Sequence, residues 1–169
     1  MRSAILSYDA RLSEQLRALA GRAPWLRRAA IPLARSGDAW LWWVGIALVG
    51  LIGGPSTYRN AVLVAGAILV TALLVRLGKT LTRRARPEGD WGGIYRRFDP
   101  HAFPSGHAAR SVLLAVLGFA LGPPWLGALL SAWALAVSVS RVALGVHYVS
   151  DIVAGAALGL ACGLVAASC

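Results

Sequence analysis

Five apolar runs dominate this chain, and each is long enough, or nearly long enough, to cross a lipid bilayer as a helix. A transmembrane helix needs about 20 mostly apolar residues, because lipid offers its backbone no hydrogen-bond partners. With 57% hydrophobic residues, the chain of 169 residues is also too apolar for a soluble domain of this size. The sequence therefore predicts an all-α, polytopic membrane bundle of about five transmembrane helices, at residues 39–54, 60–81, 105–121, 125–144 and 151–168.

The first apolar run is the shortest, and it begins with Trp40, Trp42 and Trp43. Tryptophan concentrates at the membrane–water interface. We therefore expect these three side chains to anchor the run in the headgroup region. Residues 39–169 are predicted to form one transmembrane catalytic domain.

Residues 1–38 have a different pattern, because seven arginines interrupt every apolar run before it could span a membrane. Leu6, Leu12, Leu16 and Leu19 recur near helical spacing, with charged residues between them. This pattern predicts an amphipathic helix that lies on the membrane surface. A helix that packs on the transmembrane segments, with no role in lipid binding, fits the pattern equally well.

Three short motifs lie between the apolar runs, and together they carry the residues of a phosphoryl-transfer site. Arginine and lysine can bind phosphate oxygens, one histidine can attack phosphorus, a second can protonate the leaving group, and a carboxylate can orient an imidazole. The motifs are Lys79-x6-Arg86-Pro87, Pro104-Ser105-Gly106-His107 and Ser140-Arg141-x5-His147-x3-Asp151.

In this order and spacing, the three motifs resemble those of the type 2 phosphatidic acid phosphatase superfamily. The resemblance covers residues 79–151 and implies that His147 is the nucleophile, forming a phosphohistidine with Asp151 as its partner. It also implies that His107 protonates the leaving oxygen and then helps to activate water. From spacing alone, a helical stretch would place the Asp151 carboxylate beside the His147 ring.

The remaining motif residues are candidates for binding the phosphate. Lys79, Arg86 and Arg141 are cations close to membrane level, where an unpaired charge is costly, so a shared anion is expected between them. The first helical turn after Pro104 offers backbone N–H groups to an anion, with the Ser105 hydroxyl and the close approach permitted by Gly106. Ser105 can equally serve as a helix N-cap.

These cations can balance the phosphate charge, so we expect no metal and no cofactor. The neighbouring Arg83 and Arg84 fit better as residues that extend to the lipid headgroups than as phosphate ligands.

The segment between the first two motifs, residues 88–103, is the expected specificity element. Tyr95, Arg96, Arg97 and His101 are its candidates for contact with the substrate headgroup. Arg96 and Arg97 fit equally well as part of a positive belt at the membrane surface.

The charge distribution predicts the orientation of the protein. Of its 17 lysines and arginines, only Arg59 falls in an expected turn on the face opposite the motifs. The positive-inside rule then places the active site on the cytoplasmic face of a bacterial inner membrane. A net charge of +10 spread along apolar segments suits an anionic bilayer and an anionic lipid substrate, and argues against nucleic acid.

The sequence thus predicts a metal-independent membrane lipid phosphatase. The candidate substrates are a polyprenyl-phosphoribose phosphate, as for small bacterial members of the superfamily, a polyprenyl pyrophosphate, or phosphatidylglycerol phosphate. A phosphotransferase that passes the same phosphohistidine to a second lipid or sugar remains an alternative. So does a non-catalytic lipid-binding or transport protein, although its motif residues should then be degraded.

Overall fold

The computed structural model describes residues 2–88 and 99–169, with side chains from residue 6 onward. In these ranges the chain is helical, apart from the connections and one isolated antiparallel bridge between Ala85 and His101. The helices are α1 (Arg2–Gly21), α2 (Pro24–Ser36), α3 (Ala39–Ile52), α4 (Pro55–Thr82), α6 (Gly106–Leu121), α7 (Pro124–Ala143) and α8 (Val149–Ala167). The prediction of an all-α bundle is confirmed.

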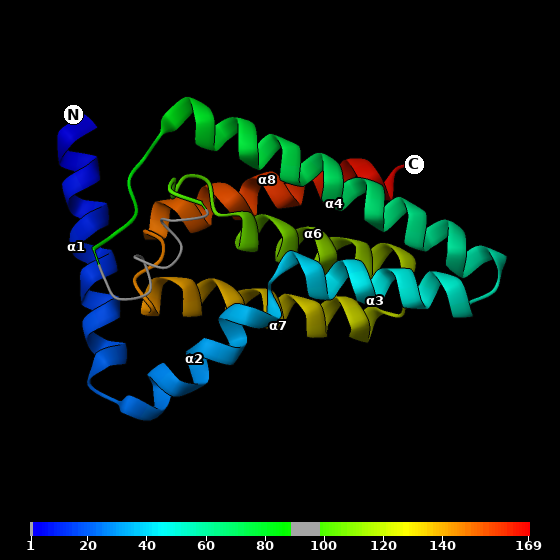
Figure 1. Cartoon of the computed structure of the whole chain (residues 1–169), viewed down its shortest axis with the longest axis horizontal. Helices are drawn as coiled ribbons and strands as arrows, with labels where there is room; N and C mark the ends of the chain where they lie inside the picture. The colour runs from blue at the N-terminus through cyan, green and yellow to red at the C-terminus, as the bar shows by residue number, and fades with distance from the viewer. Residues whose placement is uncertain (1, 89–98) are drawn as a thin grey trace.

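Helices α3, α4, α6, α7 and α8 lie alongside one another, and α1 and α2 lie across one end of this bundle (Figure 1). Helix α6 packs against α4, α7 and α8. Its leucines Leu113, Leu114 and Leu117 form the core with Ile68 of α4. The end of α4, the start of α6 and the turn from α7 to α8 all meet at the end covered by α1 and α2.

Glycines on one face of α8 let α6 approach it closely. A Cβ atom at Gly155 would lie 2.3 Å from the Ser105 carbonyl oxygen, and one at Gly159 would lie 2.1 Å from that of Ala109. The Ser105 N–H also donates to the Asp151 carbonyl oxygen at 2.9 Å. Small residues on one helix face permit such packing, and here the packing brings the second and third motifs together.

The helix boundaries agree with the expected spans to within a few residues, but only three of them meet the length and hydropathy of a membrane span. These are α4, α7 and α8. Helices α3 and α6 have 14 and 16 residues, respectively. At 1.5 Å per residue they extend only about 21 and 24 Å. The protein is an integral membrane protein, and the count of five crossings stays a prediction.

Of the three tryptophans expected at the interface, Trp42 points inward instead. Its ring packs against Trp133 of α7 with centroids 4.8 Å apart, and its Nε1 donates to the Ser36 carbonyl oxygen at 3.0 Å. Trp40 remains exposed, as expected of an anchor. The indole N–H of Trp42 is thus satisfied within the protein.

The N-terminal segment forms two helices that meet at Ala23 and Pro24, where α2 begins with proline in its first turn. Helix α1 exposes Leu16 and Leu19 but buries Asp9 and Ser13. This polar inward face was not expected for a helix that only rests on lipid.

Candidate active site

A cavity of about 470 Å³ lies at the end of the bundle where the three motifs meet. It is bounded by the end of α4, the start of α6, the turn before α8 and residues 99–101. Motif residues from all three segments line it: Lys79, Arg86, Gly106, His107, Arg141 and His147. Residues far apart in the sequence therefore form one cationic site.

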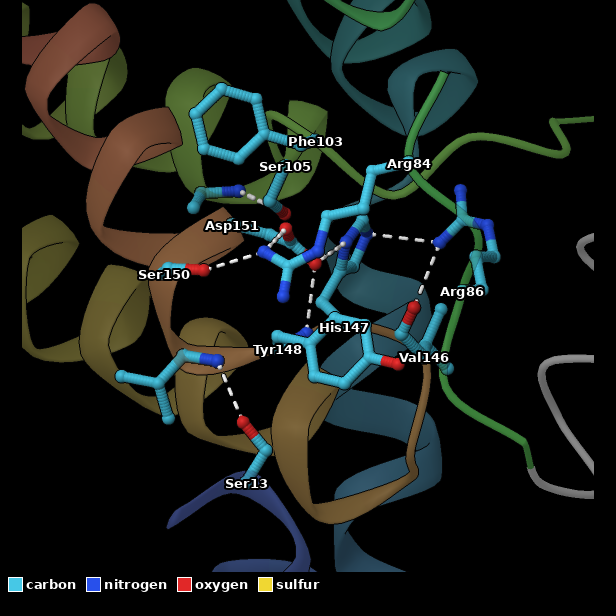
Figure 2. A network of polar contacts seen from close by, with 12 residues as sticks. Ser13, Arg84, Arg86, Phe103, Ser105, Val146, His147, Tyr148, Ser150 and Asp151 are labelled. Atoms are coloured by element: carbon cyan, nitrogen blue, oxygen red, sulfur yellow. Dashed lines mark hydrogen bonds and ion pairs between the residues drawn. The ribbon is translucent and has the colours of Figure 1, made fainter. Parts of the chain in front are cut away.

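His147 lies at the base of this site and is only 1% exposed. Its Nε2 is 3.1 Å from Arg86 Nη1, and its Nδ1 faces Asp151 Oδ2 at 3.5 Å (Figure 2). The second distance permits charge interaction but exceeds a formed hydrogen bond. With Nδ1 protonated toward Asp151, the lone pair on Nε2 is directed to the cations that would hold a phosphate.

The turn that carries His147 is not helical, contrary to the simplest explanation of its four-residue spacing from Asp151. Helix α7 ends at Ala143, and Gly145 adopts a positive φ of 67°, which glycine tolerates best. The N–H groups of Val146 and His147 both donate to the Arg141 carbonyl oxygen, at 3.0 and 3.3 Å. Arg141 thus shapes the turn through its backbone and lines the cavity with its side chain.

The environment of His147 favours the neutral imidazole. Burial, together with the positive charges of Arg141, Arg86 and Lys79, holds the pKa of His147 well below its usual value of 6.5. A charged ring would have to be desolvated among other cations. The neutral form is the one that can act as a nucleophile.

Asp151 is fully buried and held at both carboxylate oxygens. Its Oδ2 accepts from the Tyr148 N–H at 2.8 Å, and its Oδ1 accepts from Arg84 Nη1 at 2.8 Å. Because a buried carboxylate needs a full set of partners, these contacts fix its orientation beside His147.

Ser105 is the N-cap of α6, and its Oγ accepts from the Ala108 N–H at 3.4 Å. Two residues later, His107 lines the cavity, and its Nε2 lies 2.9 Å from Asp38 Oδ1. Asp38 comes from the connection between α2 and α3. The hydrogen bond from His107 holds the pKa of Asp38 below its usual value, so Asp38 is an ionised partner for that ring.

Asp99 pairs with two of the cations that are expected to bind a phosphate. Its carboxylate pairs with Lys79 and lies 2.8 Å from Arg86 Nη2. Partial burial opposes its ionisation, yet Lys79 and Arg86 hold the pKa of Asp99 below the usual value. An entering phosphate would therefore have to displace this carboxylate.

Of the four residues predicted to contact the substrate headgroup, the structure describes one. His101 lines the cavity. Tyr95, Arg96 and Arg97 lie outside the residues that the structure describes.

Beyond the motifs, the cavity extends along α4 past Val75 and Ala72 to Ile68. This part of the lining is mostly apolar, and it also includes Thr71 and Arg76. Arg110, one turn beyond His107 on α6, also lines it; its side chain reaches the Gly37 carbonyl oxygen, and its buried Nε has no hydrogen-bond partner. The site thus combines the motif cations, an apolar extension along α4, and the further cations Arg76 and Arg110.

Sequence reasoning missed several polar residues around the motif histidines: Asp9, Asp38, Arg84, Asp99 and Arg110. The expectation that Arg84 extends to the headgroups is wrong, because its side chain is 19% exposed and pairs with Asp9 and Asp151. The sequence did contain a signal that Arg84 lies at the site. Residues before proline favour extended backbone, and alternate residues of an extended segment share a face, so Arg84 belongs with Arg86.

In the two described ranges, no group of three or more His, Cys, Asp and Glu side chains is placed to hold a metal ion. The cations that line the cavity, among them Lys79, Arg86 and Arg141, can bind an anion.

Comparison with known proteins gives consistent results. Residues 60–169 match the model of the PAP2 superfamily. The chain is 34% identical over 146 residues to decaprenylphosphoryl-5-phosphoribose phosphatase of Mycobacterium tuberculosis strain H37Rv, covering 84% of this chain and 79% of the relative. It is 36% identical over 150 residues to the enzyme of that name from Mycolicibacterium smegmatis, covering 87% and 80%.

Two crystal structures share the fold. A transmembrane PAP2-type phosphatidylglycerolphosphate phosphatase from Bacillus subtilis aligns with a TM-score of 0.80 at 22% identity, over 98% of this chain and 85% of that one. Aquifex aeolicus LpxE aligns with a TM-score of 0.75 at 23% identity, over 92% and 94%.

Proposed function

This chain belongs to the PAP2 superfamily, and from that premise we propose that it removes a terminal phosphate from a membrane lipid through a phosphohistidine at His147. The observation that carries the proposal is the His147 ring. It is buried between Arg86 and Asp151, with one nitrogen directed into a cationic cavity. This is the arrangement of an activated nucleophile and its orienting group.

The proposed reaction has two displacements. Nε2 of His147 forms a bond to phosphorus while the bond from phosphorus to the lipid oxygen breaks, and His107 gives its proton to that oxygen. His107 then takes a proton from water as the water oxygen bonds to phosphorus and the bond to Nε2 breaks. Lys79, Arg86 and Arg141 stabilise the charge on the phosphoryl oxygens in both steps.

We propose that no metal takes part, because these three cations and the N–H groups near Ser105 supply the required positive charge. Activity should therefore be nearly unchanged in excess EDTA. A strict requirement for magnesium would contradict this. Vanadate should inhibit, since its trigonal bipyramid bonded to His147 resembles the transition state, and such mimics bind tightly.

For the substrate we favour a polyprenyl-phosphoribose phosphate. The relatives matched over most of their length are named for decaprenylphosphoryl-5-phosphoribose. Such a lipid carries a phosphodiester between its terminal phosphate and its tail, and Arg110, which belongs to none of the motifs, lines the same cavity. A guanidinium there could bind that second phosphoryl group.

A panel of purified lipid phosphates, with phosphate release as the readout, tests the proposal. The panel should contain a polyprenyl-phosphoribose phosphate, a polyprenyl pyrophosphate, phosphatidylglycerol phosphate and phosphatidic acid. Loss of the nucleophile in His147→Ala should lower kcat by at least about a thousandfold. Activity within about tenfold of the wild type would contradict the phosphohistidine mechanism.

The same panel separates hydrolysis from phosphotransfer. Products are compared with and without an added lipid or sugar acceptor. Free phosphate in both cases supports the phosphatase, and a phosphorylated acceptor supports the transferase.

A further inference from the structure

We propose that Arg84 and helix α1 form a positioning unit for Asp151, which makes the N-terminal helix a working part of the active site. This inference rests on the proposed function, since it assigns Arg84 and Asp9 a role in holding the carboxylate that orients His147. Neither residue belongs to the three motifs.

Arg84 binds the first turn of α8 rather than extending to solvent. Its Nη1 donates to Asp151 Oδ1 at 2.8 Å and to Ser150 Oγ at 2.6 Å (Figure 2). Its guanidinium carbon also lies 4.1 Å from the centre of the Tyr148 ring. The planar group is therefore held by hydrogen bonds at its edge and by an aromatic ring at its face.

Helix α1 holds the other side of the same guanidinium. Asp9 Oδ2 accepts from Arg84 Nη2 at 2.7 Å, and Asp9 Oδ1 accepts from the Ser150 N–H at 3.0 Å. One turn later, Ser13 Oγ accepts from the Val149 N–H at 3.0 Å. Asp9 and Ser13 are 7% and 6% exposed.

These contacts satisfy N–H groups that a helix cannot satisfy for itself. The first N–H groups of any helix have no partner within it, and at α8 those of Val149 and Ser150 are capped by α1. Helix α1 thus caps α8 from a distant part of the chain, and it fixes the turn from which Asp151 projects.

The position of Arg84 determines which oxygen of Asp151 faces His147. Arg84 engages Oδ1, while Oδ2 is left with the Tyr148 N–H and the His147 ring. Without Arg84, the buried carboxylate would lose its cation and its fixed rotation. Arg84 therefore acts on His147 through Asp151, and Asp9 acts through Arg84.

The experiment compares Arg84→Met and Arg84→Lys with Arg83→Met in the full-length protein in nanodiscs. Arg83 is the matched control, because it is the adjacent arginine, is exposed, and its Nε donates to the Thr80 carbonyl oxygen at the end of the same helix. We expect Arg84→Met to lower kcat about 10- to 100-fold with KM changed less than about threefold, since the reacting phosphate is still bound. Arg84→Lys, a cation without the planar fork, should recover part of this loss.

Asp9→Asn tests the part played by α1, with Glu14→Gln as its surface control on the same helix. We expect a loss in kcat of about 3- to 10-fold, and the double variant Asp9→Asn, Arg84→Met should lose less than the product of the two single losses. Multiplicative losses would overturn the coupling between α1 and Arg84.

Vanadate affinity, measured by calorimetry, provides a readout that does not require turnover. It should fall about tenfold in Arg84→Met, because the ligand bonds to a correctly oriented His147. If Arg84→Met keeps wild-type kcat and vanadate affinity while His147→Ala is inactive, the positioning role is overturned and the proposed phosphatase stands. If the wild type and Arg83→Met release no phosphate from any lipid in the panel, the proposed function fails by itself.

Discussion

At the scale of single residues, each motif histidine has its own carboxylate, and the two carboxylates come from different parts of the fold. Asp151 faces His147 from the first turn of α8, and Asp38 bonds His107 from the connection before α3. A carboxylate beside a buried histidine fixes the orientation of the ring and offsets part of the cost of charging it. This suits His107, which must carry a proton to the leaving oxygen in the proposed reaction.

Asp38→Asn tests the role of this second pair. The amide retains the shape of the side chain but removes the charge that would stabilise the imidazolium of His107. We expect kcat to fall about 10- to 100-fold on a lipid alkyl phosphate. With a substrate whose leaving group needs no protonation, such as p-nitrophenyl phosphate, the loss should be much smaller. Equal losses on both substrates would contradict an acid role for this pair.

The low pKa of His147 predicts a dependence of stability on pH. In the unfolded chain His147 takes up a proton near pH 6.5, whereas in the folded protein its pKa lies well below that value. The contribution of the neutral His147 ring to the free energy of unfolding is therefore fully present above pH 6.5. It is lost as the pH falls toward the pKa of His147 in the folded protein. The loss is about 1.4 kcal/mol for each pH unit in this window.

Thermal unfolding of the wild type and His147→Gln between pH 7.5 and 5.5 provides the measurement. The Tm of the wild type should fall more steeply with decreasing pH than that of the variant. Parallel curves would mean that His147 titrates normally in the folded protein. Because both proteins share every other titrating group, the difference between the two curves reports on this ring and on the groups that interact with it.

At the scale of elements, α4 serves both chemistry and binding. Its last turn supplies Lys79, and Val75, Ala72 and Ile68 line the apolar extension of the cavity. We expect the first part of the lipid tail to lie against these residues.

Ala72→Trp tests this placement, because Ala72 lines the cavity and a large ring there would fill the apolar extension. KM for a long-chain lipid phosphate should rise at least about tenfold, whereas kcat/KM for a soluble phosphate ester should change less than about threefold. Leu73→Trp is the control, since Leu73 is exposed on the same helix and does not line the cavity. Equal effects of the two variants would contradict a tail site at Ala72.

Elements also explain what the sequence could and could not predict. Apolar runs and prolines located the helices, because length and composition decide membrane insertion locally. The motifs identified His107, His147 and three of the cations that line the cavity, Lys79, Arg86 and Arg141. Asp38 and Asp9 were not predicted as partners, because the packing of α1 and α2 against α7 and α8 brings them to the site. No local sequence pattern encodes such a contact.

At the scale of the whole molecule, the arginine-rich helices and the site share one end of the bundle. Helix α1 packs on α7 and α8, and α2 packs on α7, at the end where the motifs meet (Figure 1). The turn between α3 and α4, with Arg59 just inside α4, lies at the other end. The asymmetry of charge noted in the sequence is therefore an asymmetry between the two ends of the folded molecule.

This asymmetry leads us to propose that the site faces the cytoplasm, since positive residues near membrane spans stay on that side. The test uses a Cys162→Ser, Cys169→Ser background that carries one new cysteine. Arg28→Cys, exposed on α2 at the site end, should resist a membrane-impermeant thiol reagent in intact cells and react after lysis. Ser56→Cys, exposed at the start of α4, should react from outside. The reverse pattern would place the site outside and the substrate in the outer leaflet. A polyprenyl pyrophosphate, hydrolysed there for recycling, would then be the better substrate assignment.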